Sequence, residues 1–229
     1  MHLFYAPDIE KTHELPEEEA RHCLKVLRLT EGEVITITDG KGHFYQAAIA
    51  TAGSKRCLVN ILERTTQEPL WEGHLHIAMA PTKNMDRNEW FAEKATEIGI
   101  DELTFLETRF SERKVIKTDR IEKIVVSAMK QSLKARLPII NEMTPFDRFI
   151  GQPHNGQKFI AHCYPGEKAL LKELLQPGED TLILIGPEGD FSEEEVKKAL
   201  EQGFKPISLG KARLRTETAA LVACMTRQL

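Results

Sequence analysis

Residues 182–220, LILIGPEGDFSEEEVKKALEQGFKPISLGKARLRTETAA, contain two short apolar runs that each lead into a glycine turn. The first run, 182–185, is typical of a parallel strand that is buried on both faces. The GPEG sequence that follows predicts a tight turn with exposed backbone. The second run, 207–209, ends at Gly210 and predicts another buried strand.

The segment between the two strands has the signals of a helix. Ser192 and Glu195 have the spacing of a capping box, and the acids after Ser192 favour the positive end of a helix dipole. Gly203 is expected to end this helix, and a second helix is predicted over 216–225. The stretch therefore predicts a βαβα unit with two glycine loops.

In open α/β sheets, ligands bind beyond the carboxyl ends of the strands, so the loops 186–189 and 209–215 should meet at one pocket. Lys211 is followed by Ala212, which excludes a phosphate-binding loop, and GPEG lacks the spacing of a dinucleotide fingerprint. Four apolar side chains could form walls for a flat ring such as adenine: Leu184, Ile185, Leu209 and Leu214. From spacing alone, a pair of purely structural turns is equally plausible.

The composition is that of an ordinary globular protein, with 41% hydrophobic and 29% charged residues in a chain of 229. No apolar run is long enough to span a bilayer, and the N-terminus lacks a signal-peptide pattern. The four cysteines are scattered, and strand alternation explains His74 and His76 better than metal binding does. We therefore expect a reduced, cytoplasmic protein with no metal site and no membrane association.

Residues 1–70 have the pattern of a small β-barrel domain. A helix is predicted after Pro16, and the alternating run 34–38, followed by the hairpin signal DGKG and two further apolar runs, predicts short strands. His22 and Arg28 could contact RNA, although a plain surface role fits them equally well.

Residues 71–229 show apolar runs that alternate with helical patterns, and the linker at 67–72 marks the change. This alternation predicts an α/β domain, in which a mostly parallel sheet has helices on both faces.

Positive charge is concentrated between residues 109 and 136, where nine Lys or Arg stand against three acids. This segment has a charge of plus six, whereas the remaining 22 basic and 32 acidic residues give minus ten. Four basic residues form one stripe on the predicted helix 118–133: Arg120, Lys123, Lys130 and Lys134. Such a stripe is often only a solvated face, but the acidic background favours RNA binding.

The motifs IGPEGDFSEEEV and LGKARLRTETAAL resemble the paired C-terminal motifs of the bacterial 16S ribosomal RNA uridine-N3-methyltransferase family, in the SPOUT superfamily. The resemblance extends to KATEIGID at 94–101, FSERK at 110–114, QSLKARLP at 131–138 and the N-terminal HCLKVLRLTEGEVITITDG, and so covers nearly the whole chain. Two positions depart from the family pattern. Asp190 stands where a further glycine is usual, and an arginine usually precedes the position of Arg213.

The resemblance implies a C-terminal trefoil knot that binds S-adenosylmethionine, a PUA-like RNA-binding domain at the N-terminus, and a homodimer. It implies 16S ribosomal RNA of the small subunit as the partner, with Arg113 added to the RNA-binding candidates. Eight residues are predicted to bind the cofactor: Leu184, Ile185, Gly186, Gly189, Leu209, Gly210, Leu214 and Thr216.

Methyl transfer from a sulfonium needs alignment and an activated nucleophile rather than a metal. The uracil imide nitrogen must lose a proton, and a guanidinium can stabilise the charge left on the flanking oxygens. Arg215 is the candidate for this role. Glu217 could accept the proton or fix Arg215, although an acid in a first helical turn also has a structural explanation. Thr216 is most simply a helix cap.

Two other classes of function remain open. One is an RNA-binding module without catalysis, in which the glycine loops are only turns. The other is an enzyme with a different adenine-containing cofactor, such as a nucleotide-dependent kinase.

Overall fold

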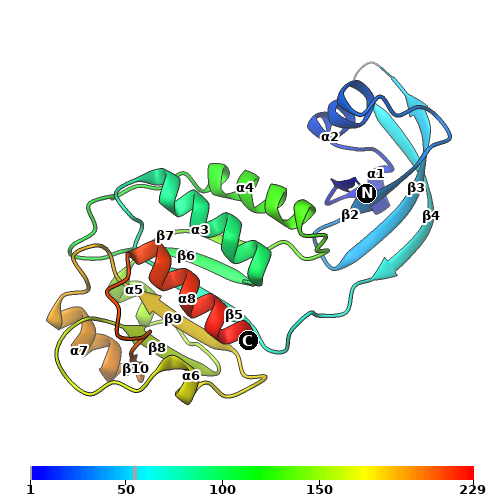
Figure 1. Ribbon diagram of the computed structural model, residues 1–229. Helices are drawn as coiled ribbons and strands as arrows, with labels where there is room; N and C mark the ends of the chain where they lie inside the picture. The colour runs from blue at the N-terminus through cyan, green and yellow to red at the C-terminus, as the bar shows by residue number, and fades with distance from the viewer. Residues whose placement is uncertain (1, 54–55) are drawn as a thin grey trace. The chain divides into compact units, whose positions relative to one another are not determined.

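The computed structural model describes residues 2–53 and 56–229, which form two compact units (Figure 1). One unit comprises the N-terminal stretch as far as Pro69 together with Val126–Leu137. The other comprises Leu70–Val125 and Pro138–Leu229. No helix within the described ranges is long and apolar enough to cross a membrane.

The first unit contains a four-stranded sheet in the order β1-β2-β3-β4. Its strands are β1 (Leu3–Tyr5), β2 (Val34–Thr38), β3 (His43–Ala52) and β4 (Cys57–Thr66), and only the β1–β2 pairing is parallel. On the far edge, Leu15 N donates to Cys57 O at 3.0 Å and Val59 N donates to His13 O at 2.9 Å. The N-terminal segment therefore borders the sheet at both edges, as the predicted small barrel requires.

The helical layer of this unit differs from the single helix that the sequence predicts. It contains α1 (Ile9–Thr12), α2 (Glu17–Arg21) and a π-helical turn, η1 (His22–Val26), in which Leu27 N donates to His22 O. Ala20 and Cys23 pack into a core with Phe4, Ile37 and Tyr45. The wide turn places His22, Lys25 and Arg28 at the exposed surface.

A distant segment completes the first unit. Ala135 O accepts hydrogen bonds from Thr38 Oγ1 at 3.3 Å and from Gly42 N at 2.8 Å. The backbones of Lys41 and Arg136 form an isolated antiparallel β-bridge. This segment lies within 71–229, where the sequence pattern gives no sign that the chain returns to the barrel.

The second unit contains a six-stranded sheet in the order β10-β8-β9-β5-β6-β7, with all pairings parallel. The strands are β5 (Leu75–Met79), β6 (Glu102–Glu107), β7 (Ile139–Pro145), β8 (Gln157–Ala161), β9 (Thr181–Ile185) and β10 (Lys205–Ile207). Strands β5 and β9 are buried along their whole length, as unbroken apolar runs require at the centre of a parallel sheet.

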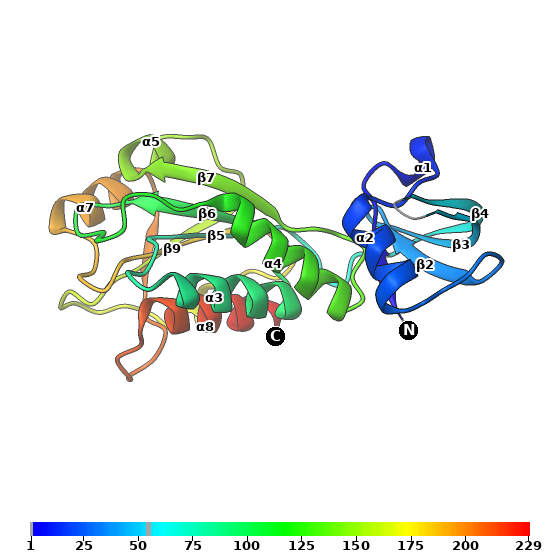
Figure 2. The same ribbon diagram turned by 90° about the horizontal axis from the view of Figure 1, so that it is seen from above.

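Helices cover both faces of this sheet (Figure 2). On one face, α3 (Met85–Ile98) and α8 (Thr216–Gln228) pack against each other, and α8 packs on β5 and β9. On the other face lie α5 (Phe146–Ile150) and α7 (Glu193–Glu201), over a core that includes Leu184 and Phe191. The remaining helices are α4 (Thr118–Gln131) and α6 (Leu171–Leu174). The predicted α/β class is confirmed, but the helix expected from KALLKELL shrinks to the four residues of α6.

Candidate active site

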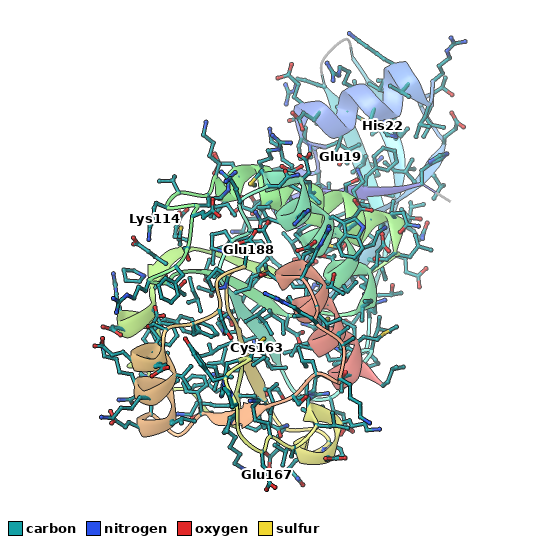
Figure 3. All side chains as sticks on the ribbon, turned by 60° about the vertical axis from the view of Figure 1, so that its left-hand side comes forward. Glu19, His22, Lys114, Cys163, Glu167 and Glu188 are labelled. Carbon is teal, nitrogen blue, oxygen red and sulfur yellow. The ribbon has the colours of Figure 1, made fainter. Side chains whose placement is uncertain are left out.

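A cavity of about 910 Å³ lies at the carboxyl ends of β8, β9 and β10. Its walls are the segment after β8, the GPEG loop after β9, the loop from 208 to 215 and the first turn of α8. Cys163, just after β8, and Glu188, in the GPEG loop, are labelled in Figure 3. This is the position at which open α/β sheets bind ligands, and the volume is within the usual range of about 300–1,000 Å³ for small-molecule sites.

The GPEG loop is tightly packed, and this explains both of its glycines. A Cβ at Gly186 would lie 3.0 Å from Phe191 N, and one at Gly189 would lie 3.1 Å from the Cβ of Phe110. Both glycines line the cavity. The absence of a side chain at Gly189 therefore makes room for Phe110, a contact that spacing alone does not reveal.

Asp190 follows GPEG and adopts a left-handed backbone conformation, with φ of 65°. Glycine takes this conformation without strain, and aspartate tolerates it better than most residues do. Its Oδ2 accepts a hydrogen bond from Cys163 N at 2.7 Å, and its Oδ1 accepts one from Phe191 N at 2.8 Å. The carboxylate thus ties the loop after β9 to the end of β8, where the resembled family usually has glycine.

The second loop runs from β10 into α8. Ser208 N donates to Ala169 O at 2.9 Å and Leu171 N donates to Ser208 O at 3.0 Å, so the segment after β8 holds the start of the loop. Gly210 has φ of 127°, and a side chain there would meet no atom within 4 Å. Its backbone therefore borders open space in the cavity.

Most of the predicted cofactor residues and Arg215 come together here. Among the predicted residues, those that line the cavity are Ile185, Gly186, Gly189, Leu209, Gly210, Leu214, Arg215 and Thr216. Arg215 is exposed and is the N-cap residue of α8, whereas Thr216 is buried in its first turn. The prediction that Leu184 forms a wall is wrong, because its side chain points into the core on the α5 and α7 face.

Glu217 lies apart from the cavity lining. Its side chain is buried, and Oε1 lies 3.6 Å from Nε of Arg87, a residue of α3 that does line the cavity. Oε2 of Glu217 is buried without a hydrogen-bond partner. The sequence prediction that Glu217 could fix Arg215 misses this pairing with Arg87, because the packing of α3 on α8 cannot be read from the chain.

Three further lining residues, His162, Cys163 and Lys168, follow β8 and were missed by sequence reasoning. Burial lowers the pKa of His162, whose Nδ1 is buried without a hydrogen-bond partner. Desolvation and the nearby Asp190 carboxylate raise the pKa of the Cys163 thiol. Cys163 is therefore a protonated thiol at neutral pH, which argues against a cysteine nucleophile.

The basic stripe of α4 is less open than the sequence predicts. Arg120 forms an ion pair with Glu89, and Lys130 forms one with Glu19. The helix ends at Gln131, so Lys134 lies beyond it and is only 7% exposed. The prediction that Lys134 continues an exposed stripe is wrong, whereas Lys123 is exposed.

The other RNA-binding candidates also differ in how accessible their side chains are to RNA. The Arg113 guanidinium donates to two backbone carbonyls, through Nε to Thr82 O at 3.3 Å and through Nη2 to Lys83 O at 2.6 Å. Arg113 thus braces a loop, whereas His22 and Arg28 are exposed on the first unit.

A fold of this kind with a glycine-walled cavity at its strand ends defines an α/β enzyme of the nucleotide- or cofactor-binding type. Residues 69–228 match the family model of the RNA methyltransferase domain, and residues 15–62 match that of the RNA methyltransferase PUA domain. The chain belongs to this RNA methyltransferase family. The expected PUA-like N-terminal domain is confirmed.

Similar proteins have consistent descriptions. A solved structure of a probable rRNA-methyltransferase from Porphyromonas gingivalis is 47% identical, with a TM-score of 0.93, and 98% of this chain and 95% of that chain are covered. A structure of a ribosomal RNA small subunit methyltransferase E from Neisseria gonorrhoeae, bound to S-adenosyl methionine, is 28% identical with a TM-score of 0.86 over 98% and 95%. The Buchnera aphidicola ribosomal RNA small subunit methyltransferase E is 29% identical over 96% of this chain and 89% of its own length.

Proposed function

We propose that this protein transfers a methyl group from S-adenosylmethionine to N3 of a uridine in 16S ribosomal RNA of the small ribosomal subunit. The observation that carries the proposal is the cavity of about 910 Å³ between the GPEG loop and the 208–215 loop, in a chain of the RNA methyltransferase family. Relatives along nearly the whole chain are small-subunit rRNA methyltransferases, and one is bound to S-adenosyl methionine. We infer a cytoplasmic location from the proposed ribosomal substrate.

The residues of the cavity suit this cofactor. Ile185, Leu209 and Leu214 offer apolar walls to an adenine ring, and the bare backbone at Gly210 can present its polar groups to the edge of that ring. Arg215 and Lys168 supply positive charge at the lining, and Asp190 and Glu188 supply carboxylates for hydroxyl or amino groups. When bound, S-adenosylmethionine supplies a methyl group that its sulfonium charge has already activated.

The protein must then make the uracil nitrogen nucleophilic. Arg215 is exposed at the cavity, so its guanidinium can approach the uracil carbonyl oxygens and stabilise the negative charge that deprotonation leaves there. Glu217 is buried outside the lining and faces Arg87, so we assign it to holding Arg87 at the cavity rather than to accepting the proton.

We further infer that the C-terminal segment is knotted. Strand β10 pairs with β8 rather than with β9, and Ser208 is held between Ala169 and Leu171 of the segment after β8. The chain then returns to pack α8 on the central strands. Passage of the C-terminal segment through the loop after β8 accounts for these pairings.

We also propose that two copies of the chain assemble. Trp90 of α3 is 43% exposed and Met225 of α8 is 44% exposed, and large apolar side chains on packed helices favour burial against a second copy. Sedimentation equilibrium would measure the mass, and a monomer at working concentration would exclude a dimeric enzyme.

Titration calorimetry separates the three classes of function that the sequence leaves open. We expect binding of S-adenosylmethionine and of S-adenosylhomocysteine, whereas a kinase would bind ATP with magnesium, and a non-catalytic RNA-binding module would bind none of these. Small subunits that lack the methylation would then be incubated with labelled cofactor, and the modified nucleoside identified by mass spectrometry. Label at any position other than uridine N3, or none after verified cofactor binding, would overturn the assignment.

A further inference from the structure

An exposed aromatic ring and a guanidinium stand together beside the cavity. Phe110 is 45% exposed, and the guanidinium carbon of Arg109 lies 5.7 Å from the centre of its ring. This distance is that of a cation–π contact. The two side chains thus present a flat apolar face and a planar cation to solvent.

The backbone around this pair is firmly fixed. Arg109 N donates to Oε1 of Glu195 at 2.8 Å, and Thr108 N donates to Ser111 Oγ at 3.1 Å. Further along the loop, Arg113 donates to the carbonyl oxygens of Thr82 and Lys83, as described above. These hydrogen bonds hold the backbone that carries the ring, so the loop loses less conformational entropy when something binds it.

The pair adjoins the wall of the cavity. Phe110 Cβ lies against Gly189, where even one added carbon would come within 3.1 Å. The segment after β5, to which Arg113 donates, is in turn linked to the GPEG turn, because Lys83 N donates to Glu188 Oε1 at 3.0 Å. Any group stacked on Phe110 would therefore sit next to the loop that forms one side of the site.

The local charge favours a polyanion. Between 109 and 117 the chain carries four basic residues, at 109, 113, 114 and 117, against the single acid Glu112. Glu112 is itself paired with Lys83 at 2.8 Å. An apolar partner alone would gain nothing from this excess of positive charge.

We propose that Phe110 and Arg109 form a stacking platform for an unstacked nucleobase of the RNA substrate, at the edge of the cofactor cavity. The proposal rests on the proposed function, since it concerns how that substrate is held. Proteins that bind unpaired RNA stack bases on aromatic rings and on arginine planes. A base held here while its phosphates meet the basic loop would fix the strand so that a neighbouring uridine can enter the cavity.

Three substitutions at Phe110 test the platform: Phe110→Ala, Phe110→Leu and Phe110→Trp. The probes are a short oligouridine RNA and small ribosomal subunits that lack the methylation. We expect Phe110→Ala to weaken RNA binding about 5- to 150-fold, with Phe110→Leu at an intermediate affinity and Phe110→Trp close to the wild-type protein. Val115→Ala is the matched control, because Val115 is an exposed apolar residue of the same loop, 72% exposed. It should leave RNA affinity unchanged.

A coupling experiment separates stacking from a general effect on the loop. Oligouridines with one abasic position are bound to the wild-type protein and to Phe110→Ala, and the losses are compared. For the stacked position, removing the base should cost the wild-type protein affinity but should cost Phe110→Ala almost none.

Two results would overturn the platform: Phe110→Ala with wild-type RNA affinity, or abasic losses that are equal in both proteins at every position. A change in oligomeric state without a change in RNA affinity would assign Phe110 to contact with a second copy of the chain and would equally reject the platform. Failure of the wild-type protein to bind S-adenosylmethionine or to methylate small subunits would instead refute the proposed function, so the two failures are distinguishable.

Discussion

Glu195 joins two loops that border the cavity, and its removal should loosen both. Its Oε2 accepts hydrogen bonds from Ser192 N at 2.8 Å and from Ser192 Oγ at 2.9 Å, which completes the capping box of α7. Its Oε1 accepts one from Arg109 N at 2.8 Å. The side chain is only 8% exposed. The substitution Glu195→Ala would leave two backbone N–H groups without their acceptors.

The expected loss follows from those two donors. A buried donor without an acceptor costs about 1–3 kcal/mol, and loss of a helix cap costs about 0.5–2 kcal/mol. Water from the neighbouring cavity can reach part of the vacated space, so we expect about 2–4 kcal/mol in total for Glu195→Ala. Glu195→Gln keeps one acceptor oxygen and should lose about half as much.

Urea denaturation of the purified variants would measure this loss. Glu194→Ala is the matched control, since Glu194 occupies the same first turn, is 65% exposed and forms an ion pair with Lys198 at 3.3 Å. Such a pair is worth about 0.3–0.5 kcal/mol. Amide hydrogen exchange should accelerate at Arg109 and Ser192 in Glu195→Ala, and the affinity for S-adenosylmethionine should fall with it, because both loops adjoin its cavity.

Equal destabilisation by Glu194→Ala and Glu195→Ala would refute this reasoning, since it would mean that only the charge near the helix end matters. Unchanged exchange at Arg109 would show that the bridge between the two loops contributes nothing.

Arg215→Ala should slow methyl transfer about 100- to 1,000-fold at saturating cofactor, while calorimetry should show nearly unchanged cofactor affinity. Equal losses in the rate of methyl transfer and in cofactor affinity would instead assign Arg215 to cofactor binding. Lys130→Ala should destabilise the first unit by about 1 kcal/mol, because it leaves the partly buried carboxylate of Glu19 unpaired. Lys123→Ala should not change the melting temperature but should reduce the slope of log Kd against log salt for RNA by about one, and overlapping salt series would exclude a phosphate contact. Burial lowers the pKa of His76 from 6.5 to about 4. The contribution of neutral His76 to the free energy of unfolding is therefore fully present above pH 6.5 and is lost as the pH falls towards 4, by about 3 kcal/mol in all. The free energy of unfolding of His76→Gln, measured by urea denaturation, should therefore depend less on pH in this window. A pH profile parallel to that of the wild-type protein would contradict the lowered pKa of His76.

The sequence predicts the second unit well where local signals are strong. The capping box at Ser192 and Glu195, the apolar run of β9 and the glycine that follows it all lie where the pattern places them. The two loops meet because carboxyl ends of parallel strands share one edge, which is a rule of topology and needs no knowledge of side-chain packing.

The errors arise where contacts distant in sequence decide the outcome. Glu217 pairs with Arg87, a residue 130 positions earlier, and no local pattern reports that α3 packs on α8. The spacing of Lys134 predicts a place on the helical stripe, yet Leu133 turns the backbone to φ of 53° and the Lys134 side chain is buried. Leu184 is apolar and next to the loop, but strand alternation points it away from the cavity lined by Ile185.

The return of residues 126–137 to the first unit has a consequence for the modularity of the protein. The N-terminal barrel depends on Ala135, whose carbonyl oxygen accepts hydrogen bonds from Thr38 and Gly42. It also depends on the backbone β-bridge between Lys41 and Arg136. An N-terminal fragment that ends at Pro69 would lack these partners, so we expect that the barrel does not fold independently. Insertions and recombination in this lineage should therefore exchange the barrel only together with the end of α4, and breakpoints near residue 70 alone should yield poorly folded chimeras.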